Sequence, residues 1–344
     1  MPASVNSPVL VADVGGTNLN LALLAPEAGR FRLLRKARFS TQETRSLLEP
    51  VRRFLDSEPS TRPSRACFSG AGPVLERRIR LTNAPWDIDG AALEEALGIP
   101  VHLVNDFIAL SCGVVQLDLA DPQQVTPLPH GDGSLPAADP RGLALVVGAG
   151  TGLGVGFVTR TDQGARAFPS EGGHIGLPIF DAETLALWRH LQEGLPGPPG
   201  AEMAVSGMGI GHLFRFLLET KRVISTPETA AILALPPADQ PAAISTRAAE
   251  DPACARTMAL FVDLYARVCA ELCAVFLPTG GLFLAGGIAA KNRGHFLQDG
   301  RFMARFERNY RAHLDQLTRA TPVYLVHDYD LSLFGAAHAP DCLP

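Results

Sequence analysis

The 344-residue sequence is poor in charged residues and has no excess of basic ones. Charged side chains make up 19% of it, and the formal net charge is -5; ordinary soluble proteins have about 25% charged residues. Binding of nucleic acid needs a basic surface, so the composition predicts no nucleic-acid partner. No run of 18 apolar residues occurs, so we expect no membrane-spanning helix and no membrane partner. The stretch Met1–Pro8 is uncharged and precedes only a short apolar run, unlike a secretory signal.

The six cysteines form no metal-binding or redox motif. No two of them are spaced as CxxC, which argues against a zinc site. Cys269 and Cys273 lie four residues apart on an apolar helical stripe. We expect both in a core, where a buried thiol behaves as a small hydrophobic group. Because disulfides are rare in reducing compartments, this pattern predicts a cytoplasmic protein.

Apolar runs interrupted by glycine-rich turns make up much of the remaining sequence. Hydrophobic residues are 47% of the chain, and its length suits two lobes better than one core. Strands are predicted on both sides of Asp13–Thr17 and of Gly148–Gly154, so each turn joins a hairpin. A third turn, Gly286–Gly287, follows a buried strand predicted at 281–285, and another strand is predicted at 65–70. Residues 122–140 are rich in Pro, Gly and Asp and are predicted to form a loop. The clearest helix runs from about 253 to 276. The pattern predicts an α/β fold with two similar halves.

Glycine turns of this kind suit phosphate groups. Without a Cβ, backbone N–H groups can approach phosphate oxygens closely. Thr17 adds a hydroxyl, and Asp13 at the base of the turn suits a magnesium ion that keeps its waters. Two common nucleotide motifs are absent from the second turn, which fits neither the Walker P-loop nor GxGxxG. Glycine turns also occur in hairpins that bind nothing, but the presence of two such turns favours phosphate binding.

Polar residues at three further places are candidates for sugar chemistry. Asn105 and Asp106 follow a predicted strand, at whose carboxyl end ligands collect in open sheets. An aspartate there can accept the proton of a substrate hydroxyl. The alternative is that Asn105 and Asp106 only cap the helix that follows. Glu171 and His174 bracket two glycines and suit vicinal sugar hydroxyls, or they form an exposed turn. Glu202 precedes another glycine-rich stretch and is a weaker candidate for binding the sugar. The alternative is that it is an ordinary solvated glutamate.

Together these residues resemble the bacterial glucokinase family, part of the hexokinase–actin–heat-shock-chaperone ATPase superfamily. The matching segments come in the family's order and cover nearly the whole chain. They are Ala12–Asn18, Val104–Phe107, Gly148–Val155, Glu171–His174, Ala201–Glu202 with Ser206–Gly207, Ala285–Ile288 and Val326–Asp328.

The resemblance implies an α/β fold of two lobes, each a ribonuclease-H-like mixed sheet with flanking helices, and a ligand cleft between them. It implies a small α/β domain of residues 8–116 plus about 328–344, and a large α/β domain of residues 117–327. The implied enzyme is a glucokinase at the entry to glycolysis. It transfers the γ-phosphoryl group of ATP to the 6-hydroxyl of glucose with Mg²⁺ as the cation, and it acts as a homodimer.

The resemblance also implies the site residues. Glucose is expected on Asn105, Asp106, Glu171, His174 and Glu202, and Asp106 is the expected catalytic base for the 6-hydroxyl. Asp13 is expected to hold Mg²⁺ through water. The residues expected to bind ATP are Ala12, Asp13, Val14, Gly15, Gly16, Thr17, Gly148, Gly150, Thr151, Gly152, Gly207, Gly209, Gly286 and Gly287.

The sequence departs from the family pattern in places. Leu19–Asn20 replaces a small residue and an Arg, and Met208 replaces a Pro. The related repressor/kinase sugar kinases carry a zinc-binding Cys cluster after the Glu-x-Gly-His element. This sequence has no Cys between Cys112 and Cys254, which disfavours that subfamily. The alternative on the same fold is a non-catalytic sugar sensor switched by nucleotide. Asp106 favours the enzyme, because a sensor needs no base there.

Overall fold

The computed structural model describes residues 7–81, 84, 86–162, 164–168, 170–327 and 330–342. These residues form two compact units. The first contains the described residues of Met1–Asp118, Gly156–Pro169 and Tyr329–Pro344, and the second those of Leu119–Val155 and Ser170–Asp328. The first unit thus includes residues 156–169, which the predicted boundaries place in the large domain. Asp328, the last residue of the matching segment Val326–Asp328, lies outside the described residues.

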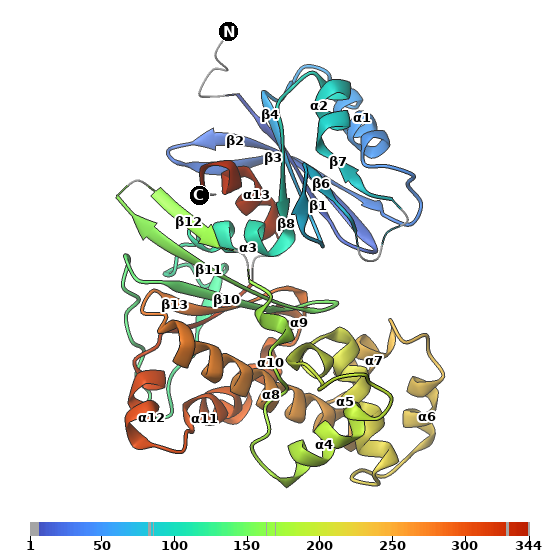
Figure 1. Ribbon diagram of the computed structural model, residues 1–344, viewed down its shortest axis with the longest axis vertical. Coiled ribbons are helices and arrows are strands. Elements are labelled where there is room, and N and C mark those ends of the chain that lie inside the picture. Colours follow the sequence, from blue (N-terminus) through green and yellow to red (C-terminus); the bar gives the residue numbers. More distant parts are fainter. Residues whose placement is uncertain are drawn as a thin grey trace. The chain divides into compact units, whose positions relative to one another are not determined.

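The first unit is built on a five-stranded mixed sheet of order β3-β2-β1-β4-β8 (Figure 1). β2 pairs antiparallel with β1 and β3, whereas β4 lies parallel to both β1 and β8. A small separate sheet has the order β5-β6-β7. The elements are β1 (Val9–Val14), β2 (Asn18–Glu27), β3 (Arg30–Ser40), α1 (Leu48–Asp56), β4 (Arg65–Gly70), β5 (Val74–Leu75), β6 (Arg78–Ile79), β7 (Ile88–Asp89), α2 (Gly90–Leu97), β8 (Val101–Asn105), α3 (Asp106–Val114), β12 (Gly164–Phe168) and α13 (Leu331–Cys342).

Alternation along β1 separates the two faces of this sheet. Leu10, Ala12 and Val14 belong to a core that also contains buried residues of α1 and α2. Asp13 points to the opposite face, because successive side chains of a strand alternate. Figure 1 shows α3 and α13 on that opposite side, and α13 contacts β1, β2 and β4. β1 therefore fills a core with one face and presents a carboxylate on the other.

Glycines allow α3 and α13 to approach each other closely. A Cβ on Gly335 would lie 1.7 Å from the carbonyl oxygen of Ala109. A Cβ on Gly113 would lie 2.4 Å from the carbonyl oxygen of Leu331. Even alanine would therefore overlap the backbone of the facing helix. This crossing fixes α13, which comes late in the chain, against the helix that begins at Asp106.

The second unit contains most of a six-stranded sheet of order β12-β11-β10-β13-β14-β9. β10, β13 and β14 are parallel, and β9 joins antiparallel within a stretch that the sequence predicts as loop. β11 begins in the second unit and continues into the first. The elements are β9 (Val125–Pro127), β10 (Ala144–Ala149), β11 (Leu153–Thr161), η1 (Gly172–His174), α4 (Ala182–Gln192), η2 (Ala201–Met203), α5 (Gly207–Glu219), α6 (Pro227–Leu233), α7 (Gln240–Arg247), α8 (Pro252–Phe276), β13 (Gly281–Ala285), α9 (Gly287–Lys291), α10 (Arg293–Leu297), η3 (Gln298–Gly300), α11 (Arg301–Glu307), α12 (Ala312–Arg319) and β14 (Val323–Val326).

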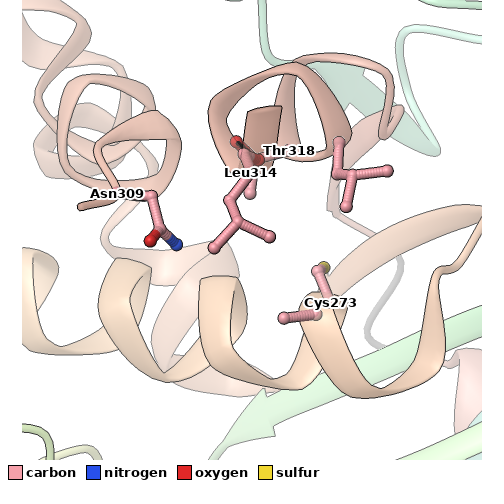
Figure 2. Close-up of a pocket in the computed structure, with 6 residues that line it drawn as sticks. Cys273, Asn309, Leu314 and Thr318 are labelled. Carbon is pink, nitrogen blue, oxygen red and sulfur yellow. Dashed lines mark hydrogen bonds between the residues drawn. The ribbon is translucent and has the colours of Figure 1, made fainter. Parts of the chain in front are cut away.

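The long helix α8 matches the predicted apolar stripe. Cys269 and Cys273 are buried on it, as expected for core residues. A small pocket between α8 and α12 is lined by Cys273, Asn309, Leu314 and Thr318, among others (Figure 2). None of the predicted site residues lines this pocket, so it is separate from the candidate active site.

The α/β class predicted from the sequence is confirmed in each unit, since both contain mixed sheets with flanking helices. The two glycine-turned hairpins, β1–β2 and β10–β11, occur where the sequence predicts them. Within the described ranges, no helix has both the length and the apolar character needed to cross a membrane.

Candidate active site

The first glycine-rich turn, Gly15–Thr17, is held in place through its carbonyl groups. Thr41, just after β3, donates its hydroxyl to the oxygen of Gly15 (2.8 Å) and its N–H to that of Thr17 (3.0 Å). Gln42 Nε2 donates to the oxygen of Gly16 (2.7 Å). In the described part of the chain, no oxygen accepts from the N–H groups of Gly16 and Thr17. The turn therefore presents two N–H donors of the kind that bind phosphate.

Asp13 is the polar residue of β1 nearest this turn. Ser332 of α13 donates its hydroxyl to Asp13 Oδ2 at 2.8 Å, and Ser69 lies opposite on β4. Burial raises the pKa of Asp13, while the hydrogen bonds of Ser332 and Ser69 and the charge of Lys36 lower it. The net shift is upward, so the protein compensates only part of the cost of burying this carboxylate.

Asn105 and Asp106 stand at the junction of β8 and α3. Asn105 Oδ1 accepts from the N–H groups of Phe107 (2.9 Å) and Ile108 (3.3 Å), so it caps the helix. Its Nδ2 donates to the carbonyl oxygen of Gly72 (3.2 Å), which fixes the orientation of the amide. Asp106 is the first residue of the helix, and its Oδ1 accepts from the N–H of Phe107 (2.9 Å). The helix-capping alternative is thus correct for Asn105, and it leaves a carboxylate on the next residue.

The carboxylates of Asp106 and Asp13 influence each other electrostatically. Burial and then the negative charge of Asp13 raise the pKa of Asp106 to about 6, against the opposing backbone hydrogen bond from Phe107. A carboxylate with that pKa is ionised at neutral pH and is well matched to accept a proton. Among the described residues, no group of three or more His, Cys, Asp or Glu could hold a metal. Magnesium needs no such group, because it keeps several waters and takes one or two carboxylates plus phosphates, so Asp13 fits it.

The second unit brings its three glycine-rich segments together. The N–H of Gly207 at the start of α5 donates to the carbonyl oxygen of Gly150 at 2.8 Å. Gly286 has a φ of 87°, and a Cβ there would lie 3.0 Å from the carbonyl oxygen of Ala149. Both contacts reach the turn at 148–154 from segments more than fifty residues further along the chain. These contacts pack the start of α5 and the Gly286–Gly287 turn against the turn at 148–154.

Glu202 is attached to the start of β11. Its Oε2 accepts from the N–H of Leu153 at 2.8 Å. A Cβ on Gly152 would lie 2.3 Å from the same oxygen, and one on Gly173 would lie 1.8 Å from the carbonyl oxygen of Leu153. Gly173 is therefore required for this packing, and a side chain at position 152 would displace the Glu202 carboxylate. The alternative of an ordinary solvated glutamate is wrong for Glu202, because its carboxylate is bound to the backbone beside the second turn.

Glu171 and His174 lie next to Glu202 within the second unit. The N–H of Ala201 donates to the carbonyl oxygen of Ile175 at 2.7 Å, which holds η2 beside η1. Glu171 Oε2 and His174 Nε2 are 3.7 Å apart, and their side chains are 87% and 64% exposed. The structure therefore places these two groups on an exposed turn, where they are accessible to a ligand of this unit.

Three residues that support the site were missed by sequence reasoning. Thr41 and Gln42 fix the carbonyl groups of the first turn, and Ser332 binds Asp13. None belongs to a recognisable motif, and Ser332 is far from Asp13 in sequence. The one signal available was a polar pair directly after a predicted strand that neighbours the turn.

Two α/β units, each with a glycine-turned hairpin and polar residues at strand ends, fit the class of sugar kinases of the hexokinase–actin superfamily. Comparison with known proteins narrows this class. The chain belongs to the glucokinase family, whose sequence model matches residues 10–341. It is 32% identical over 343 residues to the glucokinase of Nostoc punctiforme, covering 96% of this chain and 97% of that relative.

Solved structures share the fold. The glucokinase from an Antarctic psychrotroph is 29% identical with a TM-score of 0.78, covering 96% of this chain and 98% of that one. A ROK family glucokinase from Streptomyces griseus, solved with glucose and AMPPNP, has a TM-score of 0.64 at 18% identity, covering 96% of this chain and 98% of that one. At 18% identity, the similarity to the Streptomyces griseus structure supports only a common fold.

Proposed function

We propose that this protein is a glucokinase, which transfers the γ-phosphoryl group of ATP to the 6-hydroxyl of glucose and releases glucose 6-phosphate and ADP. The observation that carries the proposal is Asp106, a part-buried carboxylate with a pKa of about 6 in the same unit as the Gly15–Thr17 turn. Membership of the glucokinase family supports the choice of sugar. The reaction places the enzyme at the entry to glycolysis.

Asp106 is the proposed catalytic base. The 6-oxygen of glucose forms a bond to the γ-phosphorus as the bond from that phosphorus to the β–γ bridging oxygen breaks, and the hydroxyl proton passes to the Asp106 carboxylate. Phosphoryl transfer has a loose transition state, so positioning of the hydroxyl contributes as much as the strength of the base. The cap formed by Asn105 supports this positioning, because it fixes the first turn of α3.

The remaining sugar contacts are assigned to Asn105, Glu171, His174 and Glu202. Their oxygen and nitrogen atoms pair well with the vicinal hydroxyls of a hexose. The backbone hydrogen bond from Leu153 fixes one oxygen of Glu202, and a carboxylate can accept further hydrogen bonds. A site that pairs each hydroxyl in this way discriminates strongly against sugars that lack one.

ATP is the proposed phosphoryl donor. In support, the Streptomyces griseus neighbour was solved with AMPPNP, and the Gly16 and Thr17 N–H groups are available for phosphate. Ala12 and Val14 have buried side chains, so they would contribute only backbone atoms. Asp13 would hold Mg²⁺ through water, and the bound ion would offset phosphate charge. The other proposed nucleotide-binding residues are Gly15, Gly148, Gly150, Thr151, Gly152, Gly207, Gly209, Gly286 and Gly287.

The proposal extends to a cytoplasmic homodimer. All six cysteines are unpaired and buried, which is consistent with a reducing compartment. Sedimentation velocity on the purified chain tests the dimer, since a monomer mass at micromolar concentration would contradict it.

The decisive experiment is a coupled assay for glucose 6-phosphate with glucose, ATP and magnesium, run beside calorimetric titrations of glucose and of AMP-PNP. A kinase forms product and binds both ligands. A sugar sensor binds both ligands and forms no product, which would refute the proposal. A panel of hexoses and phosphoryl donors in the same assay then identifies the preferred pair.

A further inference from the structure

Arg38 of β3 lies in the same row of the first sheet as Asp13. Asp13 is opposite Asn20 on β2, and Asn20 is opposite Arg38 on β3. Directly opposed residues of neighbouring strands point to the same face of a sheet. With strands about 4.8 Å apart, the Cα atoms of Arg38 and Asp13 are roughly 10 Å apart. A long basic side chain and the proposed magnesium-binding carboxylate therefore share one face of the sheet, and only β2, which the Gly15–Thr17 turn joins to β1, lies between them.

The guanidinium of Arg38 is fixed beside the turn. Its Nε donates to Asn18 Oδ1 at 3.0 Å, and Asn18 directly follows Thr17. The segment after Arg38 is bonded to the turn as well, through Thr41 and Gln42. Asn18 accepts only from the Nε–H of Arg38, so the four other N–H donors of the guanidinium are not used by Asn18. In the described ranges, no carboxylate pairs with Arg38 and no oxygen accepts from these four donors.

Among the residues that the structure describes, other basic residues of β3 form ion pairs with carboxylates, unlike Arg38. Lys36, two residues earlier on the same face, pairs with Asp330 at the start of α13. Arg35 pairs with Glu58 at 3.5 Å, and Arg32 pairs with Glu27 at 3.3 Å. The protein therefore compensates three neighbouring cations internally, while the cation nearest the phosphate turn keeps its charge and most of its donors.

We propose that Arg38 is a phosphate-binding residue that holds the terminal phosphates of the nucleotide against the Gly15–Thr17 turn. This inference rests on the proposed phosphoryl transfer and adds to it a residue outside the predicted site. The planar fork of a guanidinium matches two phosphate oxygens at once, and the bond to Asn18 removes part of the entropic cost of orienting it. Arg38 would then offset charge on the phosphates from β3, while Asp13 on β1 would hold magnesium through water.

The test compares Arg38→Gln with the matched control Arg30→Gln in the full chain. Arg30 lies at the far end of β3 and is exposed, so the control removes the same charge away from the turn. The readouts are the calorimetric Kd of Mg–AMP-PNP, the Kd of glucose, and kcat and KM for ATP. We expect Arg38→Gln to weaken AMP-PNP binding or to lower kcat/KM for ATP by about 10- to 100-fold, as for a lost charge-assisted hydrogen bond. Glucose affinity should stay within about twofold of wild type by the same reasoning, because the sugar is assigned to other residues.

Two further variants separate charge from geometry. Arg38→Lys keeps the charge and loses the fork, so it should fall between wild type and Arg38→Gln. Asn18→Ala keeps the guanidinium and releases its Nε, so it should also weaken AMP-PNP binding, by less than Arg38→Gln.

The proposal is overturned if Arg38→Gln matches Arg30→Gln in both AMP-PNP affinity and kcat/KM for ATP. It is also overturned if Arg38→Gln weakens glucose binding as much as nucleotide binding, since that pattern indicates general damage to the first unit. Failure of the proposed function has a different signature. Wild type would form no glucose 6-phosphate, while weaker AMP-PNP binding by Arg38→Gln would still support the assignment of Arg38.

Discussion

Replacing Asp106 with asparagine should remove most of the activity and at the same time stabilise the first unit. The side chain keeps its shape and can still accept from the N–H of Phe107, as Asp106 Oδ1 does at 2.9 Å. It can no longer take the proton of the sugar hydroxyl. Loss of a general base lowers kcat by about 10²- to 10⁴-fold.

The gain in stability follows from the raised pKa of Asp106. Its pKa rises from the ordinary value of 3.8 to about 6, because burial and the charge of Asp13 disfavour the ionised form. Between these values the folded chain holds a proton that the unfolded chain has lost, so this group lowers stability as pH rises from 3.8 to 6. A rise of the pKa from 3.8 to about 6 corresponds to about 3 kcal/mol at pH 7.5 and to roughly half of that at pH 5. Asp106→Asn avoids this cost at both pH values.

The measurement is urea unfolding of the first unit at the two pH values. Trp86 lies in the first unit and Trp188 in the second, so a Trp188→Phe background makes the fluorescence report on the first. Asp56→Asn on the surface of α1 serves as the control and should change neither stability nor kcat. The reasoning is refuted if Asp106→Asn is no more stable than wild type at pH 7.5, or if its advantage does not shrink at pH 5. The assignment as base is refuted if the variant keeps more than half of the wild-type kcat.

Other predictions follow from the same structure. kcat/KM for glucose should fall about tenfold per pH unit below pH 6, as Asp106 takes up its proton; a pH-independent rate down to pH 5 would contradict this. Glu202→Gln keeps an acceptor for Leu153 and should weaken glucose binding by about 1–3 kcal/mol; unchanged titrations of the sugar would place it elsewhere. Gly335→Ala should destabilise the first unit by about 3 kcal/mol, because its Cβ would meet the backbone of Ala109. Gly294→Ala, where a Cβ meets no atom within 4 Å, should be neutral or slightly stabilising; thermal unfolding of both variants beside wild type is the measurement.

The local structure around the site was predictable because short, contiguous sequence patterns determine it. Apolar alternation and the Gly15–Gly16 step gave the first hairpin, and observed β1 and β2 surround the predicted turn. The strand at 65–70 and the strand at 281–285 occur at their predicted bounds. Asn105 also lies at its predicted strand end, where it caps the helix that begins at Asp106.

The supporting contacts were not predictable, because they join residues far apart in sequence that carry no pattern. Ser332 reaches Asp13 across 319 positions, and the pairing needs the three-dimensional crossing of α13 with α3. Glu202 reaches Leu153 across 49 positions through a single backbone N–H. The short strand β9 lies in a stretch that the sequence predicts as loop, because prolines in and around it mask an edge strand that pairs with β14.

The crossing of α3 and α13 has a consequence for how the chain is synthesised. The helix that begins at Asp106 emerges from the ribosome early, but the helix that covers it follows the whole second unit. Until α13 is released, the apolar face of α3 and the face of β1 that carries Asp13 lack their covering layer. The first unit to be translated is therefore the last to be completed, and a nascent chain halted before Leu331 should remain dependent on holding chaperones.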